Sequence, residues 1–308
     1  MAKCQPFDKF MLSANDMDRQ SSSRACLICS QKLLGGVQKW HFKCQRCSYE
    51  SADLAPNINE AELSGALNEI SRERSLKELR AANFAVLLEK LKALRPSGGS
   101  LLEVGSAHGW FLEQTAPYFS ALGIEPDNGM YALSKGQGVN VRHGYFPDVL
   151  APSECFDVIV FNDVLEHIPH LDQAVEACAR HLSPDGLLLV NLPNSSGFFY
   201  KVSKLLCRLG AHSYFERMWQ KDMPSPHLHY FNKKNLHLFL ESKQFSVIDS
   251  GDLEVIRAKG LFDRLSYANE NSLIKNILLY VTILAFLPLL RLFPSDIHYV
   301  IAQKGTQQ

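Results

Sequence analysis

Residues 101–109 read LLEVGSAHG, an apolar run followed by a turn of small residues. The run predicts a buried strand, and the turn predicts the start of a helix. Small residues let a ligand approach the backbone closely, and a helix N-terminus offers free N–H groups. About twenty residues later a second predicted strand ends at Glu125, whose carboxylate can accept both hydroxyls of a ribose. This spacing is typical of a nucleoside-cofactor site in a Rossmann-like sheet.

The same loop argues against a dinucleotide cofactor. A pyrophosphate site usually needs G-x-G-x-x-G, but Ala107 stands where the middle glycine would be. A strand–helix turn that binds no ligand remains the alternative on this motif alone, because such glycine patterns are common.

From residue 100 onward, short apolar runs alternate with segments of helical periodicity. This alternation predicts a mostly parallel sheet covered by helices on both faces. The predicted strands are 100–105, 120–126, 139–143, 156–162, 187–193, 245–259 and 297–304. The predicted helices are 108–118, 127–136, 171–182 and 232–244. The sequence therefore predicts a seven-stranded, Rossmann-like α/β domain over residues 96–308.

Three segments precede this domain. Residues 1–23 form a polar leader without the apolar region of a signal peptide, so we expect a reducing, cytoplasmic compartment. Residues 24–55 carry paired cysteines. Residues 60–95 repeat apolar side chains every three to four positions, which predicts a helical linker.

Two CxxC pairs, Cys26/Cys29 and Cys44/Cys47, are separated by 14 residues. Each pair can form a knuckle with two thiolates, and two knuckles close a tetrahedron, as in a zinc ribbon. Four sulfur ligands leave no open position, so the Zn²⁺ would be structural. Disulfides, free thiols or bound iron are the alternatives, but a reducing compartment favours zinc over disulfides.

The charge distribution disfavours a general nucleic-acid binder. Lys+Arg and Asp+Glu both number 32, and residues 101–200 hold 3 basic and 12 acidic side chains. This acidic middle region would repel a polyanion.

Five segments in register resemble the class I S-adenosylmethionine-dependent methyltransferases, above all the subgroup with the ubiquinone-biosynthesis O-methyltransferases. These segments are EVGSAHG (103–109), GIEP (123–126), FDVIVFNDVLEH (156–167), LSPDG (182–186) and NLPN (191–194). The resemblance covers about 100–258 and the last strand, and HLHYFN (227–232) extends it.

The resemblance implies S-adenosyl-L-methionine as the cofactor. It implies methionine contacts from Glu103 and the 105–109 loop, ribose binding by Glu125, and a transfer site at the end of the fourth strand. The complete implied set is Glu103, Gly105, Ser106, Ala107, Gly109, Glu125, Pro126, Gly144, Tyr145, Asn162, Asp163 and Val164. Tyr145 departs from the family, which often has a small acidic residue after this glycine.

Methyl transfer from a sulfonium requires mainly alignment and exclusion of water, and an oxygen nucleophile can also need a base. His167 and His170 follow the fourth strand, and His227 and His229 follow the fifth at the same sheet edge. We favour His167 as the base, with His229 as a second candidate. The Glu166-His-x-x-His cluster could instead hold a divalent ion, and the alternative for each histidine is a structural role.

An apolar insert over about 260–295 precedes the last strand. Residues 276–290 carry no charge but fall short of the ~20 residues that span a bilayer, and Pro288 interrupts them. The alternatives are a buried helix or a lipid-facing element. With the aromatic residues at 198–200 and 214–219, we expect the insert to cover the substrate mouth, and 273–293 to contact a membrane surface peripherally.

These patterns predict methyl transfer from S-adenosylmethionine to a small-molecule, sugar or lipid-linked acceptor, at a hydroxyl, as in polysaccharide, lipid or quinone pathways. One alternative is an RNA or protein methyltransferase that uses the zinc ribbon for recognition. The other is a non-catalytic scaffold that binds the cofactor.

Overall fold

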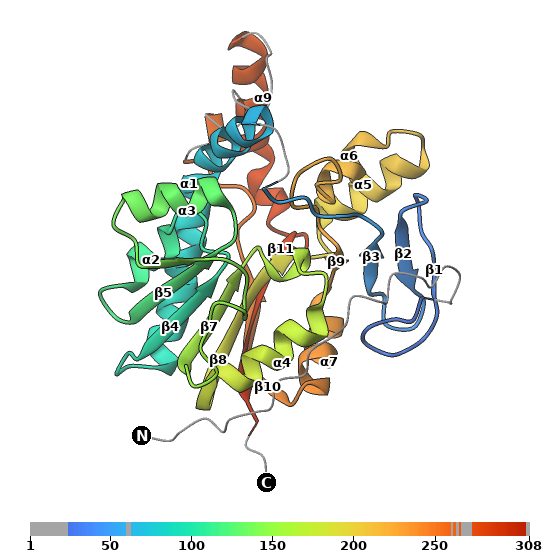
Figure 1. Ribbon diagram of the computed structural model, residues 1–308. Coiled ribbons are helices and arrows are strands. Elements are labelled where there is room, and N and C mark those ends of the chain that lie inside the picture. The colour runs from blue at the N-terminus through green and yellow to red at the C-terminus, as the bar shows by residue number, and fades with distance from the viewer. Residues whose placement is uncertain (1–23, 60–62, 260, 263–264, 266–272, 306–308) are drawn as a thin grey trace.

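The computed structural model describes residues 24–59, 63–259, 261–262, 265 and 273–305, so the predicted leader 1–23 lies outside the described residues. Its main sheet has the order β10-β11-β8-β7-β4-β5-β6 (Figure 1). The strands are β4 (Ser100–Val104), β5 (Ser120–Glu125), β6 (Val141–His143), β7 (Phe156–Asn162), β8 (Leu182–Pro193), β10 (Phe245–Asp252) and β11 (Ile297–Lys304). Strand β11 is antiparallel to both of its neighbours, and the other neighbouring pairs are parallel. The predicted seven-stranded, mostly parallel sheet is confirmed.

Helices cover both faces of this sheet (Figure 1). The helices of the described chain are α1 (Leu63–Leu94), α2 (Trp110–Thr115), α3 (Asn128–Gly136), α4 (Leu171–His181), α5 (Phe198–Arg208), α6 (Ser213–Met218), α7 (Lys233–Ser242) and α9 (Leu273–Leu290), with a 3-10 turn η1 (Leu165–His167). One core cluster joins the sheet to α4 and α7, and another joins it to α1 and α2. Burial on both faces explains why the strands are continuous apolar runs.

Helix α1 is part of the α/β core. Its side chains Phe84, Leu87 and Leu91 are buried in the same cluster as Leu101 of β4. The predicted helix 60–95 is therefore observed over Leu63–Leu94 of the described residues, and its second half packs on the sheet.

Two strands differ from their predicted bounds by more than two residues. Strand β8 already begins at Leu182, because Leu182 pairs with Phe156 before an irregularity in register. Strand β10 ends at Asp252, which pairs with His298. Leu253 N still donates to Ile297 O at 3.0 Å, and the pairing ends there because β11 begins at Ile297.

The cysteine module shares a sheet with the larger domain. Strands β1 (Leu33–Gly35), β2 (His41–Cys44) and β3 (Glu50–Ala52) continue into β9 (His229–Tyr230). Behind this sheet, Trp40 stacks on Phe215 with ring centroids 5.8 Å apart and contacts Trp219 at 5.7 Å. Phe215 and Trp219 are fully buried, so these aromatic residues hold the module in place and do not cover a substrate mouth as expected.

A buried polar network strengthens this contact. The Glu50 carboxylate accepts hydrogen bonds from Tyr200 Oη at 2.7 Å and Lys204 Nζ at 2.6 Å, and lies 2.7 Å from His41 Nε2. These partners lower the pKa of Glu50 to about 2, although burial alone would raise it. A charge buried with several donors is stable only while all of them stay in place.

Helix α9 projects from the body at the end opposite α7 (Figure 1). Only 6% of this helix is buried, so the alternative of a buried helix is wrong. None of its residues lines the main cavity, so it does not cover the mouth of that cavity either.

Candidate functional site

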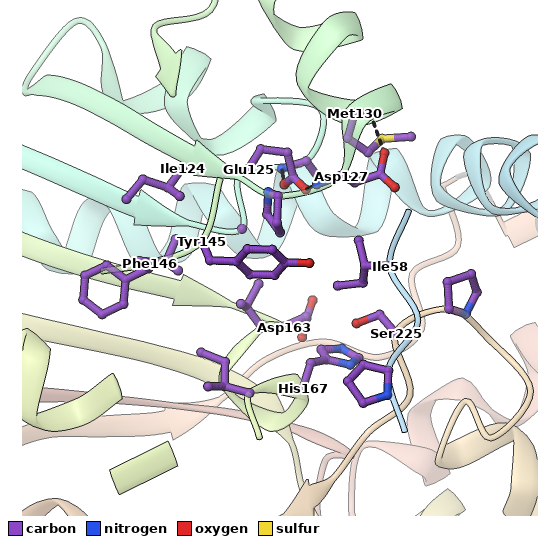
Figure 2. Close-up of a pocket in the computed structure, with 18 of the residues that line it drawn as sticks. Ile58, Ile124, Glu125, Asp127, Met130, Tyr145, Phe146, Asp163, His167 and Ser225 are labelled. Atoms are coloured by element: carbon purple, nitrogen blue, oxygen red, sulfur yellow. Dashed lines mark hydrogen bonds between the residues drawn. The ribbon is translucent and has the colours of Figure 1, made fainter. Parts of the chain in front are cut away.

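A cavity of about 460 Å³ lies at the carboxyl ends of β4, β5 and β7 (Figure 2). Parallel α/β sheets bind ligands at this edge. Glu125 and His167 point into the cavity from opposite sides, and the ring of Tyr145 lies between them (Figure 2). The cavity can therefore hold an extended ligand that contacts both side chains.

Glu125 organises the glycine loop. Its Oε2 accepts a hydrogen bond from Ala107 N at 2.7 Å, and its Oε1 accepts one from Asp127 N at 2.9 Å. Gly105 has a φ of 70°, and a Cβ there would lie 2.6 Å from the side chain of Val164. The turn therefore requires glycine, and the loop and the carboxylate hold each other in position.

Glu103 lies behind the cavity wall. Its side chain is buried, and its Oε1 accepts a hydrogen bond from Asn162 Nδ2 at 2.8 Å. Burial raises the pKa of Glu103 to about 8. The carboxyl group is therefore protonated at neutral pH in the ligand-free protein, and it sets the orientation of Asn162 at the cavity.

This raised pKa predicts a pH dependence of stability. Between pH 4.5 and about 8 the folded state binds more protons than the unfolded state, so stability falls as pH rises. We expect Glu103→Gln to be more stable than the wild type at pH 8 by up to about 4 kcal/mol and equal to it near pH 4. Denaturant unfolding without ligand measures this, with the exposed Glu113→Gln as control. If the difference in the free energy of unfolding between Glu103→Gln and the wild type is the same at pH 4 and pH 8, the pKa of Glu103 is not raised.

The structure divides the predicted cofactor residues into two groups. Those lining the cavity are Gly105, Ala107, Glu125, Pro126, Tyr145, Asn162, Asp163 and Val164. Those that do not line it are Glu103, Ser106, Gly109 and Gly144. The second group supports the wall: Gly109 precedes α2 with φ 74°, and Ser106 is buried.

Sequence reasoning missed two parts of the cavity wall. One is Arg80 of α1, whose Nε lies 3.9 Å from Asp163 Oδ2. The other is a strap of residues 56–59, where Asn59 Nδ2 donates to Pro126 O and Asn59 Oδ1 accepts from Asn128 N, both at 2.9 Å. No motif marks either, because both come from segments distant in sequence.

His167 is the histidine that lines the cavity. Its Nδ1 lies 2.9 Å from Pro226 O, which orients the ring. The Nε2 atoms of His167 and His227 each lie 3.9 Å from Glu166 Oε1. Glu166 is fully buried, its two carboxylate oxygens accept no hydrogen bond from the described residues, and burial raises the pKa of the carboxyl group.

Glu166, His167 and His227 are close enough to hold a cation together, with ligand atoms within 4.8 Å of one another. The predicted cluster named His170 in this role, but His170 is exposed and lines a separate hollow beside the cysteine module. His227 takes its place because the chain after α6 returns over η1, where Leu228 N donates to Glu166 O.

His229 does not reach the cavity. Its Nδ1 accepts a hydrogen bond from the Tyr49 hydroxyl, and its Nε2 lies 2.9 Å from Ile168 O. Burial lowers its pKa to about 4, so it stays neutral. Because both ring nitrogens are hydrogen-bonded within the protein, His229 is not placed to act as the base.

The four cysteines of the N-terminal module converge. Their Sγ atoms lie within 4.8 Å of one another, with Cys26 and Cys47 3.4 Å apart and Cys29 and Cys44 3.5 Å apart. These distances exceed the ~2.05 Å of a disulfide. They approach the ~3.8 Å between thiolates that surround a tetrahedral ion with bonds of about 2.3 Å. The donor set therefore fits Zn²⁺.

The sheet order, and the cavity at the carboxyl ends of its parallel strands, define a Rossmann-like α/β domain. A family model described as "Methyltransferase domain" matches residues 73–250, more than half of the chain, and the chain belongs to this family. Its match begins inside α1, in agreement with the packing of that helix on the sheet.

Relatives agree with this assignment. A Mycolicibacterium smegmatis protein named "Probable S-adenosylmethionine-dependent methyltransferase" is 29% identical over 42% of this chain and 53% of that protein. A ubiquinone biosynthesis O-methyltransferase of Xylella fastidiosa is 32% identical over 38% of this chain and 51% of that enzyme. The chain thus spans about half the length of these curated relatives.

A solved structure shares the fold. It comes from Thermotoga maritima and is described as an S-adenosylmethionine-dependent methyltransferase, possible histamine N-methyltransferase. It aligns with a TM-score of 0.50 at 15% identity and covers 77% of this chain and 95% of that one. At this identity the likeness concerns the fold alone.

Proposed function

We propose that the protein transfers a methyl group from S-adenosylmethionine to a hydroxyl of a small-molecule, sugar or lipid-linked acceptor. The observation that carries the proposal is one cavity with Glu125 and the glycine loop on one side and His167 on the other. Such a cavity can bind a nucleoside at the first side and place an acceptor at the second.

The proposed cofactor position follows from the lining residues. Glu125 would accept the ribose hydroxyls, Gly105 and Ala107 would leave room for the methionine part, and Tyr145 would flank the adenine. Asn162 and Asp163, at the end of β7, would line the transfer site. The strap at 56–59 would close the adenosine side.

The proposed reaction is an in-line displacement. The acceptor oxygen forms a bond to the sulfonium methyl carbon, the carbon–sulfur bond breaks, and S-adenosylhomocysteine leaves as a neutral thioether. The acceptor's hydroxyl proton passes to His167 Nε2, while Pro226 O holds the other side of the ring at 2.9 Å. Alignment of the acceptor oxygen with the sulfonium methyl supplies most of the acceleration.

His167→Ala should lower kcat by about 100-fold or more while leaving cofactor affinity unchanged, because a positioned base contributes roughly 10²–10⁴-fold. Isothermal titration with S-adenosylhomocysteine and a turnover assay separate the two effects. The exposed His170→Ala is the matched control. Unchanged turnover in His167→Ala excludes the base.

A divalent cation at Glu166, His167 and His227 is the alternative role for this cluster. Bound there, it would lower the pKa of an acceptor hydroxyl. Turnover abolished by EDTA and restored by Mg²⁺ or Mn²⁺ favours the ion; turnover insensitive to EDTA favours the base.

The acceptor class rests on the relatives and the cavity lining. Ubiquinone O-methyltransferases act in quinone biosynthesis by name, and this cavity adds apolar side chains such as Ile58, Phe146 and Ile168. Incubation of a cell extract with radiolabelled S-adenosylmethionine, followed by separation into organic, polysaccharide, protein and RNA fractions, tests the class. Label in the organic or polysaccharide fraction supports a small-molecule, sugar or lipid-linked acceptor. Label in RNA or protein instead supports an RNA or protein methyltransferase that recognises its substrate through the ribbon.

For the cysteine module we propose a structural Zn²⁺ and a bracing role. The module buries Trp40 against α6, pairs β3 with β9, and leads directly into the strap over the cavity. A recognition surface for RNA would leave its aromatic side chains exposed, whereas Tyr49 is buried. We keep the cytoplasm as the proposed compartment, because paired cysteines at metal-ligand spacing are more typical of zinc sites in reducing compartments than of disulfides.

A further inference from the structure

Helix α9 presents an apolar surface that the other described elements leave almost entirely uncovered. It has 18 residues, a mean hydropathy of 2.1 and only 6% burial. No charged residue lies between Lys275 and Arg291. Soluble proteins rarely expose so much contiguous apolar surface without a binding partner.

The exposed side chains point in several directions. Leu273, Leu278 and Phe286 are 65%, 63% and 55% exposed. At about 100° per residue they project roughly 140° and 80° apart around the helix axis. A protein groove or a second copy of the chain would cover one side and leave the others in water. Only an apolar solvent covers all of them.

Length and flanking charges agree with a lipid layer. Eighteen helical residues extend about 27 Å, close to the ~30 Å hydrocarbon core of a bilayer. Residues 273–293 contain two basic side chains and no acidic one. Arg291 Nη2 lies 3.6 Å from Glu254 Oε1, but its side chain is 68% exposed, and Lys275 is exposed too. Both can therefore reach anionic headgroups.

Helix α5 extends the same surface. Phe198 at its start contacts Phe293, just after α9, with ring centroids 4.6 Å apart. Its side chains Val202, Leu205 and Leu209 are exposed. Lys201 and Arg208 flank them, Lys204 turns inward to Glu50, and residues 198–212 contain no acidic side chain. An apolar stripe bordered by lysine and arginine is typical of a helix that lies on an anionic membrane.

We propose that α9 inserts into a phospholipid bilayer with anionic headgroups while α5 rests on its surface. Strand β10 is parallel to β8, so the chain leaves the sheet toward α9 at the same edge that carries the cavity. Docking through α9 therefore places the cavity's edge of the sheet toward the membrane.

Flotation of the full chain with phosphatidylcholine vesicles, with and without phosphatidylglycerol, tests this. We expect the wild type to float, more strongly with phosphatidylglycerol. The double substitution Leu278→Asp and Phe286→Asp should lower the partition coefficient at least about 100-fold, because acidic residues are excluded from the hydrocarbon core. Leu238→Asp, on the exposed side of α7 and 44% exposed, should float like the wild type.

Three outcomes overturn the proposal. The first is a wild type that does not float. The second is a double variant that floats as well as the wild type while circular dichroism shows both proteins folded. The third is a dimer in sedimentation velocity that Leu278→Asp dissociates, together with no vesicle binding, which would assign α9 to contact with a second copy. Flotation needs no methyl transfer, so either result leaves the proposed function standing.

Discussion

Glu125→Ala should weaken binding of S-adenosylmethionine by about 100-fold or more. The substitution leaves the N–H groups of Ala107 and Asp127 without their acceptor, at a cost of about 1–3 kcal/mol for each buried donor. It also removes the proposed acceptor of the ribose hydroxyls. Isothermal titration with S-adenosylhomocysteine measures the affinity without turnover.

Two further variants make this result specific. Glu113→Gln changes an exposed carboxylate on α2 and should bind like the wild type. Glu125→Gln keeps the size and one acceptor oxygen, so its affinity should fall between those of the wild type and the alanine variant. If Glu125→Ala binds normally while remaining folded, the nucleoside does not occupy this cavity as we propose.

Cys44→Ser should reduce bound zinc from one ion per chain to none and raise the dissociation constant for S-adenosylhomocysteine by about 10- to 100-fold. A structural zinc ion supplies much of the folding free energy of a small module. Without the ion, the β3–β9 pairing and the strap are no longer held in place. One hydrogen bond then lost beside the cavity is that from Asn57 N to Pro224 O at 2.8 Å. Losing about two such bonds at about 1 kcal/mol each weakens binding about 30-fold, within this range, because 1.4 kcal/mol is a tenfold change.

Metal analysis, thermal unfolding and titration together test this coupling. Cys207→Ser changes a buried thiol outside the four-cysteine cluster and should keep the zinc and the affinity. A Cys44→Ser protein that loses its metal but binds S-adenosylhomocysteine normally would show that the strap holds without the ribbon.

The sheet could be predicted from sequence because its signals are local. Strands β7 and β11 were predicted at their observed bounds, since each is a run of apolar or alternating residues with turns beside it. The four cysteines were likewise predicted as one cluster from their spacing. By contrast, β9 has only two residues and forms only because β3 lies beside it.

The cavity was predicted in part. Glu125, Asn162 and the glycine loop follow strands directly, so the parallel topology alone brings them to one edge. Arg80, the strap and the partnership of Glu166 with His227 depend on how α1, the cysteine module and the chain after α6 pack on that edge. His229 has the same sequence context as His227, yet the neighbouring Tyr49 and Ile168 engage both of its nitrogens.

The sequence by itself determined the α/β class, the glycine loop with its acidic partner and the metal-ligand spacing, because strand periodicity and short-range motifs act within a few residues. Only the tertiary structure decided which histidine reaches the cavity, that the aromatic residues after β8 hold the ribbon, and that α9 is exposed. These properties depend on contacts between segments far apart in the chain. The sequence of an apolar helix does not show whether the helix is buried in a protein core or exposed at the surface, where it can contact lipid.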